Sequence, residues 1–364
     1  MSSISKYRIA VIPGDGIGPE ILPAGAKVLS AVAEEFGFGL QYEEFPYGAG
    51  YYKQTGTFMP EDALRILQEF DAIYFGAVGL PDVDDTLPAR LFTFKIRTSF
   101  DQYVNYRPAR LLPGIEGPLR NKTPQDIDFV VIRENTEGEF VQSGGFVRPE
   151  FAEGMATDTS IFTRKGIERI AHYSFQLARR RRKHLTNVTK SNTLIHSLAY
   201  WDRIVEQVSI SYPDVEYHKM YVDNASANFV LHPEKFDVIV TTNFIGDILS
   251  DLGGAIMGSL GLGPSGNINP QKTYPSMFEP IHGSAPDIAG QGIANPIGAI
   301  WSASLMLEHL GQQKAAESIV RAIEMTVGQG VLPVDLGGSA KTMEITEVIV
   351  KNLKSAAKND APSN

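Results

Sequence analysis

The fold class is decided by Arg8–Glu20, which reads Arg-Ile-Ala-Val-Ile-Pro-Gly-Asp-Gly-Ile-Gly-Pro-Glu. Its apolar run, Ile9–Ile12, predicts a buried strand over Arg8–Ile12. The glycine-rich residues that follow predict either a tight strand-to-helix turn or a close backbone approach to a ligand. Glu20–Glu35 then carries apolar residues at helical spacing. The three glycines stand at every second position, so the turn lacks the G-x-G-x-x-G spacing of a standard Rossmann fingerprint.

The same alternation of short apolar runs and helical patterns continues along the chain. Further elements are predicted as strands over Asp71–Val78, Ile127–Ile132, Leu185–Val188 and Phe236–Val240, and as a helix over Thr163–Lys183. Such alternation predicts an α/β fold with a largely parallel sheet. Because the patterns change near Leu80–Lys95 and again after Leu252, we expect the middle of the chain to form one domain and its two ends another.

Composition excludes several classes of protein. The chain has 364 residues, and 33 Lys and Arg against 42 Asp and Glu give a net charge of −9, which repels a phosphate backbone, so we expect no nucleic-acid partner. There is no cysteine, so any metal must bind to oxygen or histidine. The N-terminus lacks the pattern of a signal peptide, which predicts a cytoplasmic protein.

One uncharged segment, Ile288–Leu307, has the length of a membrane span, about 20 residues. It contains Asn295 and Pro296, however, a pair typical of a helix start. The helix that remains is too short to cross a bilayer. We therefore predict a buried core helix and no membrane partner.

Basic side chains follow two of the predicted strands. Arg133 comes directly after the strand that ends at Ile132, and Lys190 follows the strand that ends at Val188. Because ligands gather beyond the carboxyl ends of parallel strands, these residues are candidates for a binding site. Arg97 and Arg107 add two guanidinium groups. Convergence of the three arginines would suit a di- or tricarboxylate, since guanidinium binds carboxylate in a bidentate manner.

Acidic residues give the sharpest signal. Asp247 and Asp251 are four residues apart in a predicted helix, where two like charges on one face repel each other. A divalent cation bound through oxygen would reverse that repulsion, and Asp223 could supply a third carboxylate. Such ligands suit Mg²⁺ or Mn²⁺. A solvated helix face is the alternative interpretation.

The histidines carry less information. Six of them show no metal-ligand spacing and are interpreted as structural or surface residues: His172, His184, His196, His218, His232 and His309. His282 differs, because it opens the sequence His-Gly-Ser-Ala-Pro-Asp within a glycine-rich loop.

Together these motifs resemble the β-decarboxylating hydroxyacid dehydrogenase family, which includes isocitrate, 3-isopropylmalate and tartrate/D-malate dehydrogenases. The resemblance runs from Arg8 to about Val350 and rests on Gly14–Glu20, Arg133–Gly138 and Glu279–Asp287, together with the arginine and aspartate spacings. It implies an isopropylmalate dehydrogenase-like two-domain α/β fold with a mixed, largely parallel sheet and no standard Rossmann fingerprint. Residues 1–99 plus 255–364 would form the large cofactor-binding domain, and residues 100–254 the dimerisation and metal/substrate domain.

The resemblance also implies roles for individual residues. It places the substrate, a small hydroxy diacid, on Arg97, Arg107, Arg133, Thr93 and Phe140. It assigns Mg²⁺ or Mn²⁺ to Asp223, Asp247 and Asp251, with K⁺ as an additional candidate cation. It makes Lys190 and Asp223 catalytic residues that enter the partner subunit's active site in a homodimer. It assigns NAD to Ile17, His282, Gly283, Ser284, Ala285, Asp287 and Asn295.

Asp287 bears on the choice of cofactor. Its carboxylate could accept the ribose hydroxyls of NAD and would repel the 2′-phosphate of NADP. Family members that use NADP carry lysine and tyrosine at the positions of Asp287 and Ile288, and this chain has neither.

Substrate choice in the family depends on the segment before the first arginine, here Leu91–Arg97. It lacks the serine and asparagine of isocitrate enzymes and the paired leucines of isopropylmalate enzymes. Because Glu137–Glu139 and Gly246–Gly253 look closest to tartrate/D-malate dehydrogenases, we expect metal-dependent, NAD-linked oxidation of a four-carbon 2-hydroxy diacid. The family has a tyrosine where this chain has Phe140, and phenylalanine cannot protonate an enol, so the expectation is oxidation with or without decarboxylation.

Other functions remain open at this stage. A 3-isopropylmalate dehydrogenase is the nearest alternative. A metal-dependent hydrolase could use the aspartates, and a non-catalytic carboxylate-binding protein could use the arginines. These last two leave the loop from His282 to Asn295 unexplained.

Overall fold

The computed structural model describes residues 5–358 and divides the chain into two compact units. Unit 1 contains the described residues up to Gln102, the segment Arg110–Pro124, and the described residues from Gly254 onward. Unit 2 contains Tyr103–Ala109 and Gln125–Gly253. Arg110–Pro124 thus belongs to the first unit, although the sequence analysis assigned it to the middle domain.

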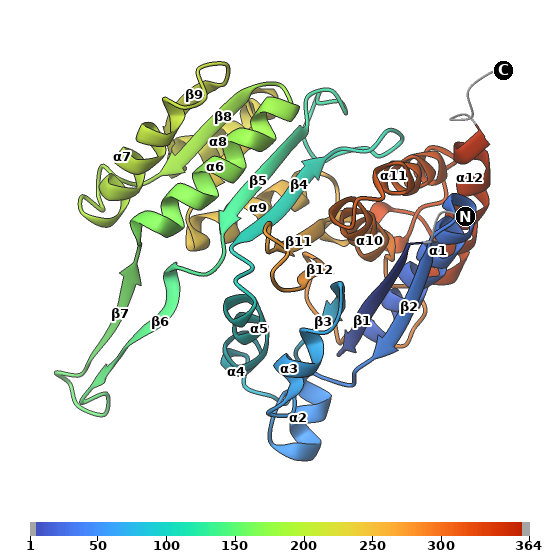
Figure 1. Ribbon diagram of the computed structural model, residues 1–364, viewed down its shortest axis with the longest axis horizontal. Helices are drawn as coiled ribbons and strands as arrows, with labels where there is room; N and C mark the ends of the chain where they lie inside the picture. The colour runs from blue at the N-terminus through green and yellow to red at the C-terminus, as the bar shows by residue number, and fades with distance from the viewer. Residues whose placement is uncertain (1–4, 359–364) are drawn as a thin grey trace. The chain divides into compact units, whose positions relative to one another are not determined.

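The strands of unit 1 follow the order β2-β1-β3-β12-β11 (Figure 1). Their bounds are β1 Lys6–Gly14, β2 Gly39–Glu44, β3 Ala72–Ala77, β11 Pro264–Ile268 and β12 Ser276–Pro280. β1 pairs in parallel with β2 and β3, β12 is parallel to β3, and β11 is antiparallel to β12. The core of β1, Ile9–Ile12, is buried throughout, as expected for a parallel strand covered on both faces.

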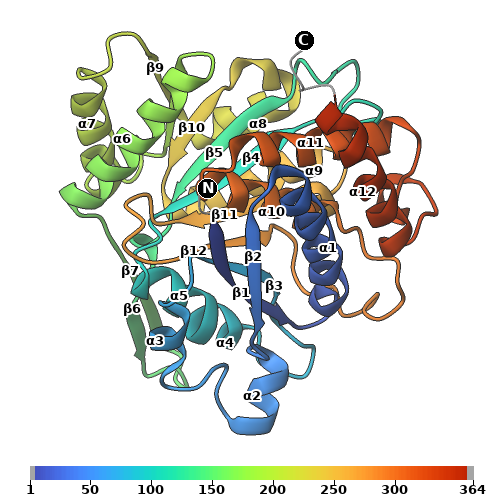
Figure 2. The ribbon, with the colours of Figure 1, turned by 45° about the vertical axis from the view of Figure 1, so that its right-hand side comes forward.

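Helices cover this sheet. Their bounds are α1 Gly18–Phe36, α2 Ala49–Thr55, α3 Ala63–Leu67, α4 Thr86–Pro88, α5 Phe94–Ser99, α10 Ile297–His309, α11 Gln313–Gly328 and α12 Thr342–Lys358, with a π-helical turn Ala89–Thr93 and 3₁₀ turns Leu260–Leu262 and Val334–Leu336. Figure 2 shows α1, α10, α11 and α12 gathered into one group. Within it, α10 is buried along almost its whole length.

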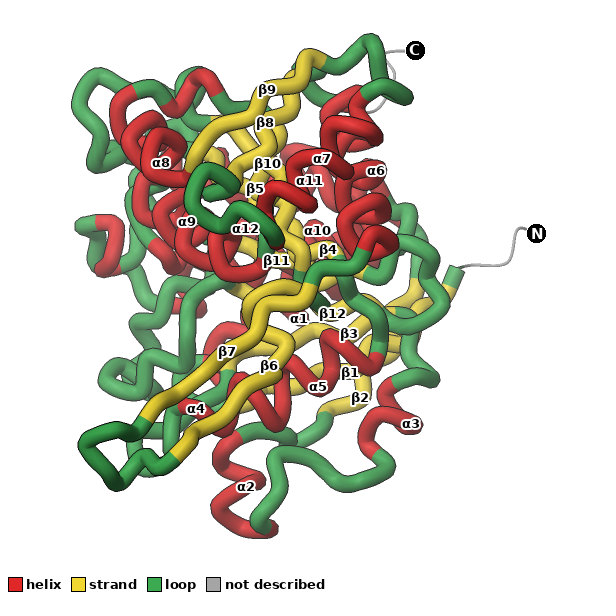
Figure 3. The backbone as a smooth tube through the Cα atoms, turned by 90° about the vertical axis from the view of Figure 1, so that its left-hand side faces the viewer, coloured by secondary structure: helices red, strands yellow, loops and turns green. Residues whose placement is uncertain are grey.

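The strands of unit 2 follow the order β4-β5-β10-β8-β9 (Figure 3). Their bounds are β4 Val104–Arg110, β5 Asp128–Glu134, β8 His184–Thr189, β9 Glu216–Tyr221 and β10 Val238–Thr241. β5, β10, β8 and β9 are all parallel. The helices are α6 Arg164–Arg180, α7 Ser197–Ser209, α8 Val222–Leu231 and α9 Asn243–Ile256, with a 3₁₀ turn Pro233–Lys235.

A two-stranded antiparallel hairpin extends from the rest of unit 2 (Figure 1). It consists of β6 (Gly138–Val147) and β7 (Met155–Ile161). Several apolar side chains on it are exposed, among them Phe146 and Phe151.

These elements confirm the α/β class and the strands and helices predicted from hydrophobic periodicity. The uncharged segment contains most of α10, which continues through Glu308 to His309, and the Asn295 side chain accepts a hydrogen bond from the Ile297 N–H, as expected of a helix start. Within residues 5–358, no helix has the length and apolar character needed to cross a membrane.

Candidate active site

The polar residues predicted at strand ends in unit 2 share one edge of its parallel sheet. Arg133 of β5 is the register partner of Thr241, the last residue of β10, and α9 begins two residues later. Lys190 directly follows β8, and Asp223 lies in the first turn of α8 after β9. Parallel pairing therefore places the candidate residues from four strands at the same carboxyl edge.

Two arginines hold the aspartates of α9. The buried Arg133 side chain donates from Nε to Asn243 Oδ1 at 2.8 Å, and its Nη1 donates to the Asp247 carboxylate. Arg107 Nη1 donates to Asp251 Oδ1 at 3.0 Å and lies 3.9 Å from Asp247 Oδ1. Both guanidinium groups are thus fixed beside two carboxylates that lie one helical turn apart.

These carboxylates fit a hard divalent cation. The side chains of Asp247 and Asp251 are 45% and 55% exposed, so each presents oxygen to solvent as well as to arginine. Burial raises the pKa of Asp251, while the adjacent Arg107 lowers it and Asp247 raises it further. Oxygen donors of this type suit Mg²⁺ or Mn²⁺. Within the described part of one chain, Asp223 does not complete a cluster with them.

Asp223 is instead paired with Lys190. Lys190 Nζ donates to Asp223 Oδ1 at 2.7 Å, and this hydrogen bond lowers the pKa of the Asp223 carboxyl. The two residues follow neighbouring parallel strands, β8 and β9. Lys190 and Asp223 of the same chain therefore form an ion pair with each other.

Phe140, at the base of the β6–β7 hairpin, borders the same arginine. The Arg133 guanidinium lies 5.5 Å from the centroid of the Phe140 ring, and the Phe244 ring packs edge-on at 6.0 Å.

Sequence reasoning missed two supporting residues in unit 2, Glu139 and Asn243. Glu139 accepts hydrogen bonds from Thr242 Oγ1 at 2.8 Å and from the Phe244 N–H at 3.1 Å, at the start of α9. An acidic side chain at a helix N-terminus is a recognisable signal, but Glu139 is distant in sequence from the helix that it caps.

Arg97 lies in unit 1 and already has an acidic partner. Its Nη2 donates to Glu279 Oε1 at 2.7 Å, and that oxygen also accepts from Asn267 Nδ2 at 2.6 Å. Arg97 Nε is buried and has no acceptor among the described residues. Thr93, in the π-helical turn, donates its hydroxyl to Ala89 O at 3.1 Å. No local sequence pattern indicates that Glu279 balances the charge of Arg97, because the two residues are 182 positions apart.

A cavity of about 320 Å³ in unit 1 collects most of the residues predicted to bind cofactor. Those that line it are Ile17, His282, Gly283, Ala285 and Asn295. Ser284 acts through its backbone, because its carbonyl accepts from the Ile17 N–H at 2.8 Å. Asp287 is exposed beside the lining residue Ile288.

His282 gives this cavity a specific acceptor. Its Nδ1 donates to Gly283 O at 3.0 Å, so in the neutral ring Nε2 carries the lone pair. Burial lowers the pKa of His282 and keeps the ring neutral. Nε2 is buried and has no partner in the described chain. An unpaired acceptor in a mainly apolar cavity fits the amino group of an adenine ring.

The glycine-rich turn approaches protein backbone. Gly14 and Gly16 have φ of +69° and +60°, and a Cβ on Gly16 would lie only 1.8 Å from Ser284 O. The Asp15 carboxylate accepts from the backbone N–H groups of Ala49 and Gly50, at 2.7 and 2.8 Å. The alternating glycines therefore allow β1 and α1 to pack closely against the His282 loop.

The structure adds residues that the sequence analysis did not associate with this loop. Further lining residues of the cavity are Ser259, Gly261, Ile293, Val334 and Asp335. Asp335 accepts from Asn295 Nδ2 at 3.0 Å. No local pattern marks Asp335, because its partner lies 40 residues away.

Strand pairing brings together two of the histidines that the sequence analysis interpreted as structural or surface residues. His184 and His218 show no metal-ligand spacing in sequence, yet they lie beside Glu216 with ligand atoms within 4.8 Å of one another. They come from adjacent strands, β8 and β9, so their proximity depends on strand pairing.

Comparison with known proteins agrees with this architecture. Residues 8–349 match the isocitrate/isopropylmalate dehydrogenase family. The chain is 49% identical to the D-malate dehydrogenase (decarboxylating) of Escherichia coli K12, over 96% of this chain and 99% of that protein. It is 48% identical to the tartrate dehydrogenase/decarboxylase of Pseudomonas putida, over 96% of this chain and 98% of that protein.

A solved structure supports the same conclusion. The isocitrate dehydrogenase of Methylococcus capsulatus superposes with a TM-score of 0.87 at 35% identity, over 96% of this chain and 99% of that one. The expected fold is thereby confirmed. Given the family match and these relatives, the chain belongs to the isocitrate/isopropylmalate dehydrogenase family.

Proposed function

We propose that this enzyme catalyses metal-dependent, NAD-linked oxidation, with or without decarboxylation, of a four-carbon 2-hydroxy diacid such as tartrate or D-malate. The observation that carries the proposal is the cluster of Arg107 and Arg133 with Asp247 and Asp251 at the carboxyl edge of unit 2. It combines two fixed carboxylate binders with two oxygen ligands. The names of the relatives from Escherichia coli and Pseudomonas putida support the substrate class.

Each part of the cluster has a role in this reaction. Arg107 and Arg133 bind the substrate carboxylates, because their forked N–H donors match carboxylate geometry. Asp247 and Asp251 hold Mg²⁺ or Mn²⁺, which when bound supplies Lewis acidity toward the C2 oxygen. Lys190 Nζ of the partner subunit, as the neutral amine, would accept the C2 hydroxyl proton, while the C2 hydride would pass to NAD.

The cavity in unit 1 supports NAD as hydride acceptor. His282 Nε2, which is buried without a partner in the described chain, would accept from the adenine amino group, and the apolar lining of the cavity would accommodate the ring. The exposed Asp287 carboxylate accepts from the ribose hydroxyls, where it also disfavours a 2′-phosphate.

A homodimer completes the site in this proposal. Apolar side chains on α8 and α9 are exposed in one chain, among them Leu231 at 62% and Ile248 at 52%. Burial of these side chains against a second copy would bring the Lys190–Asp223 pair of each chain to the aspartates of the other. K⁺ is proposed only as an accessory cation.

The test is a substrate panel. NADH formation is followed by absorbance with NAD, Mn²⁺ and, in turn, D-malate, tartrate isomers, isocitrate and 3-isopropylmalate. We expect the highest kcat/KM with a four-carbon diacid. A clear preference for 3-isopropylmalate would replace the proposal with the nearest alternative, and no NADH with any substrate would refute it.

Two variants test whether the activity depends on the cluster of arginines and aspartates. Asp247→Asn is expected to abolish most NADH formation, because it removes a cation-binding charge. Asp214→Asn is the matched control, since Asp214 makes an exposed ion pair with Arg179 elsewhere in unit 2. Equal activity of both variants would contradict the role given to Asp247.

A further inference from the structure

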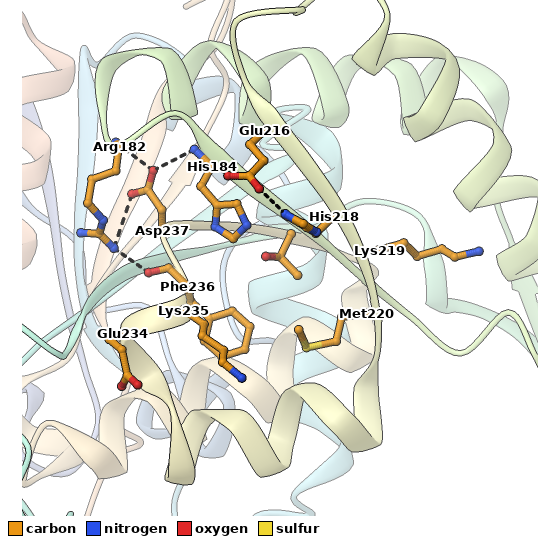
Figure 4. Close-up of a pocket in the computed structure, with 11 residues that line it drawn as sticks. Arg182, His184, Glu216, His218, Lys219, Met220, Glu234, Lys235, Phe236 and Asp237 are labelled. Carbon is orange, nitrogen blue, oxygen red and sulfur yellow. Dashed lines mark hydrogen bonds and ion pairs between the residues drawn. The ribbon is translucent and has the colours of Figure 1, made fainter.

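Two histidines and a glutamate form a cluster at the amino-terminal ends of strands β8 and β9. The candidate active site lies at the carboxyl ends of the same sheet. His184 is the first residue of β8, and its register partner Glu216 is the first residue of the outermost strand β9. His218 is two residues beyond Glu216, so both side chains project from the same face of β9. Figure 4 shows the two imidazole rings beside the Glu216 carboxylate.

The distances fit a shared ion. One ligand atom from each of the three residues lies within 4.8 Å of the others. A tetrahedral zinc site, with bonds of about 2.0–2.2 Å, holds its ligand atoms about 3.3–3.6 Å apart. His218 Nε2 and Glu216 Oε1 are 2.7 Å apart, and the His184 and His218 ring centroids are 5.0 Å apart. Small side-chain rotations therefore suffice to close the cluster around an ion.

The protonation states also suit a metal. Burial and the neighbouring His218 lower the pKa of His184, so its ring is neutral and offers a lone pair. Neither ring nitrogen of His184 has a hydrogen-bond partner in the described chain. The hydrogen bond from His218 lowers the pKa of Glu216, which keeps this carboxylate ionised.

Nearby cations are engaged with other partners. Arg182 donates to Phe236 O and to Asp128 O. Lys219 pairs with Asp202 at 3.6 Å, and its amine points away from the cluster in Figure 4. A cavity of about 430 Å³ adjoins the three residues and leaves room for a water ligand.

We propose that His184, Glu216 and His218 bind a first-row transition-metal ion such as Zn²⁺, at a site distinct from the aspartate cluster. Imidazole nitrogens favour Zn²⁺ over Mg²⁺, whereas the all-oxygen aspartate cluster favours Mg²⁺ or Mn²⁺. Six residue steps, about 20 Å of extended chain, separate His184 from Lys190 just beyond the carboxyl end of β8, so the histidine cluster lies at the opposite end of these strands from the candidate active site. A bound ion would link the outermost strand β9 to its neighbour β8 and stabilise the pairing of these two strands.

The experiment is calorimetric titration of the full chain with Zn²⁺ in the presence of excess Mg²⁺, which occupies the aspartate cluster. The variants are His218→Ala and, as a second disruption, Glu216→Gln. The matched control is His232→Ala. His232 also pairs with a glutamate, Glu234, at 3.2 Å, but this pair does not belong to the group of three possible metal ligands. Thermal unfolding with and without Zn²⁺ gives an independent readout.

The wild type should bind one Zn²⁺ that excess Mg²⁺ does not displace. His218→Ala and Glu216→Gln should weaken this binding by more than about tenfold, since loss of even an outer-shell partner costs about 10–100-fold. His232→Ala should bind as the wild type does. Zn²⁺ should raise the unfolding temperature of the wild type and not that of His218→Ala. Equal Zn²⁺ affinity in the wild type and His218→Ala, or displacement by Mg²⁺, would overturn the proposal.

Discussion

Gly246→Ala tests whether the packing of α9 on β5 positions Arg133. A Cβ at residue 246 would lie 2.6 Å from Arg133 Cβ and 2.7 Å from its Cγ. Arg133 Cβ is attached directly to the β5 backbone and does not move when the side chain rotates, so the clash is relieved only if α9 shifts away from β5. Such a shift would disturb the hydrogen bonds from Arg133 to Asn243 and Asp247, because both residues lie on α9.

The expected change in stability is the balance of two terms. Alanine is favoured over glycine inside a helix by about 1 kcal/mol. Overpacking of a buried contact costs about 1–3 kcal/mol. The free energy of unfolding should therefore fall by about 0–2 kcal/mol. Activity should respond more strongly, because a displacement of about 1 Å in a binding group can cost about 100-fold in rate.

Urea unfolding and the kcat/KM for D-malate are the two assays. Gly328→Ala is the control, since Gly328 also lies in a helix, α11, and a Cβ there would meet no atom within 4 Å. We expect wild-type kcat/KM for the control and a large loss for Gly246→Ala. If Gly246→Ala is more stable than the wild type and fully active, the packing argument is refuted.

Three further predictions concern decarboxylation, the choice of cofactor and the pH dependence of stability. Phe140→Tyr should raise the CO₂ released per NADH formed from D-malate, because it supplies a phenolic proton for the enol; an unchanged ratio and rate would remove this role. Asp287→Lys combined with Ile288→Tyr should erode a wild-type preference for NAD over NADP of about 100-fold in kcat/KM, or about 2.7 kcal/mol; equal wild-type use of both cofactors would show the assignment to be wrong. Burial lowers the pKa of His309 from 6.5 to about 4, so the unfolded ring takes up a proton below pH 6.5 while the native ring stays neutral. Stability should therefore fall by about 2 kcal/mol between neutral pH and about pH 5, and His309→Gln should flatten that dependence in urea titrations; an identical pH slope would contradict it.

The sequence predicted the parts of the fold that depend on local periodicity. The strand around Ile9–Ile12 and the buried helix that begins near Pro296 were evident from apolar spacing and from helix-start residues. The position of Arg133 and Lys190 at one edge also followed, because parallel strands end together.

Contacts between distant segments could not be predicted in this way. His184 and His218 come together only because β8 and β9 pair in one particular register. Glu279 balances Arg97 across 182 residues of sequence, and no local pattern indicates that contact. The glycines of the first turn were consistent with either tight packing or a ligand, and only the proximity of Ser284 distinguishes the two.

The most direct test of the proposed chemistry is the initial rate of NADH formation from D-malate with Mn²⁺, after addition of excess EDTA, and after Mn²⁺ is restored. The account predicts NADH formation with Mn²⁺, its loss with EDTA and its recovery with the metal, because the substrate is oxidised only with a cation held at Asp247 and Asp251. Full activity in excess EDTA would contradict the central claim.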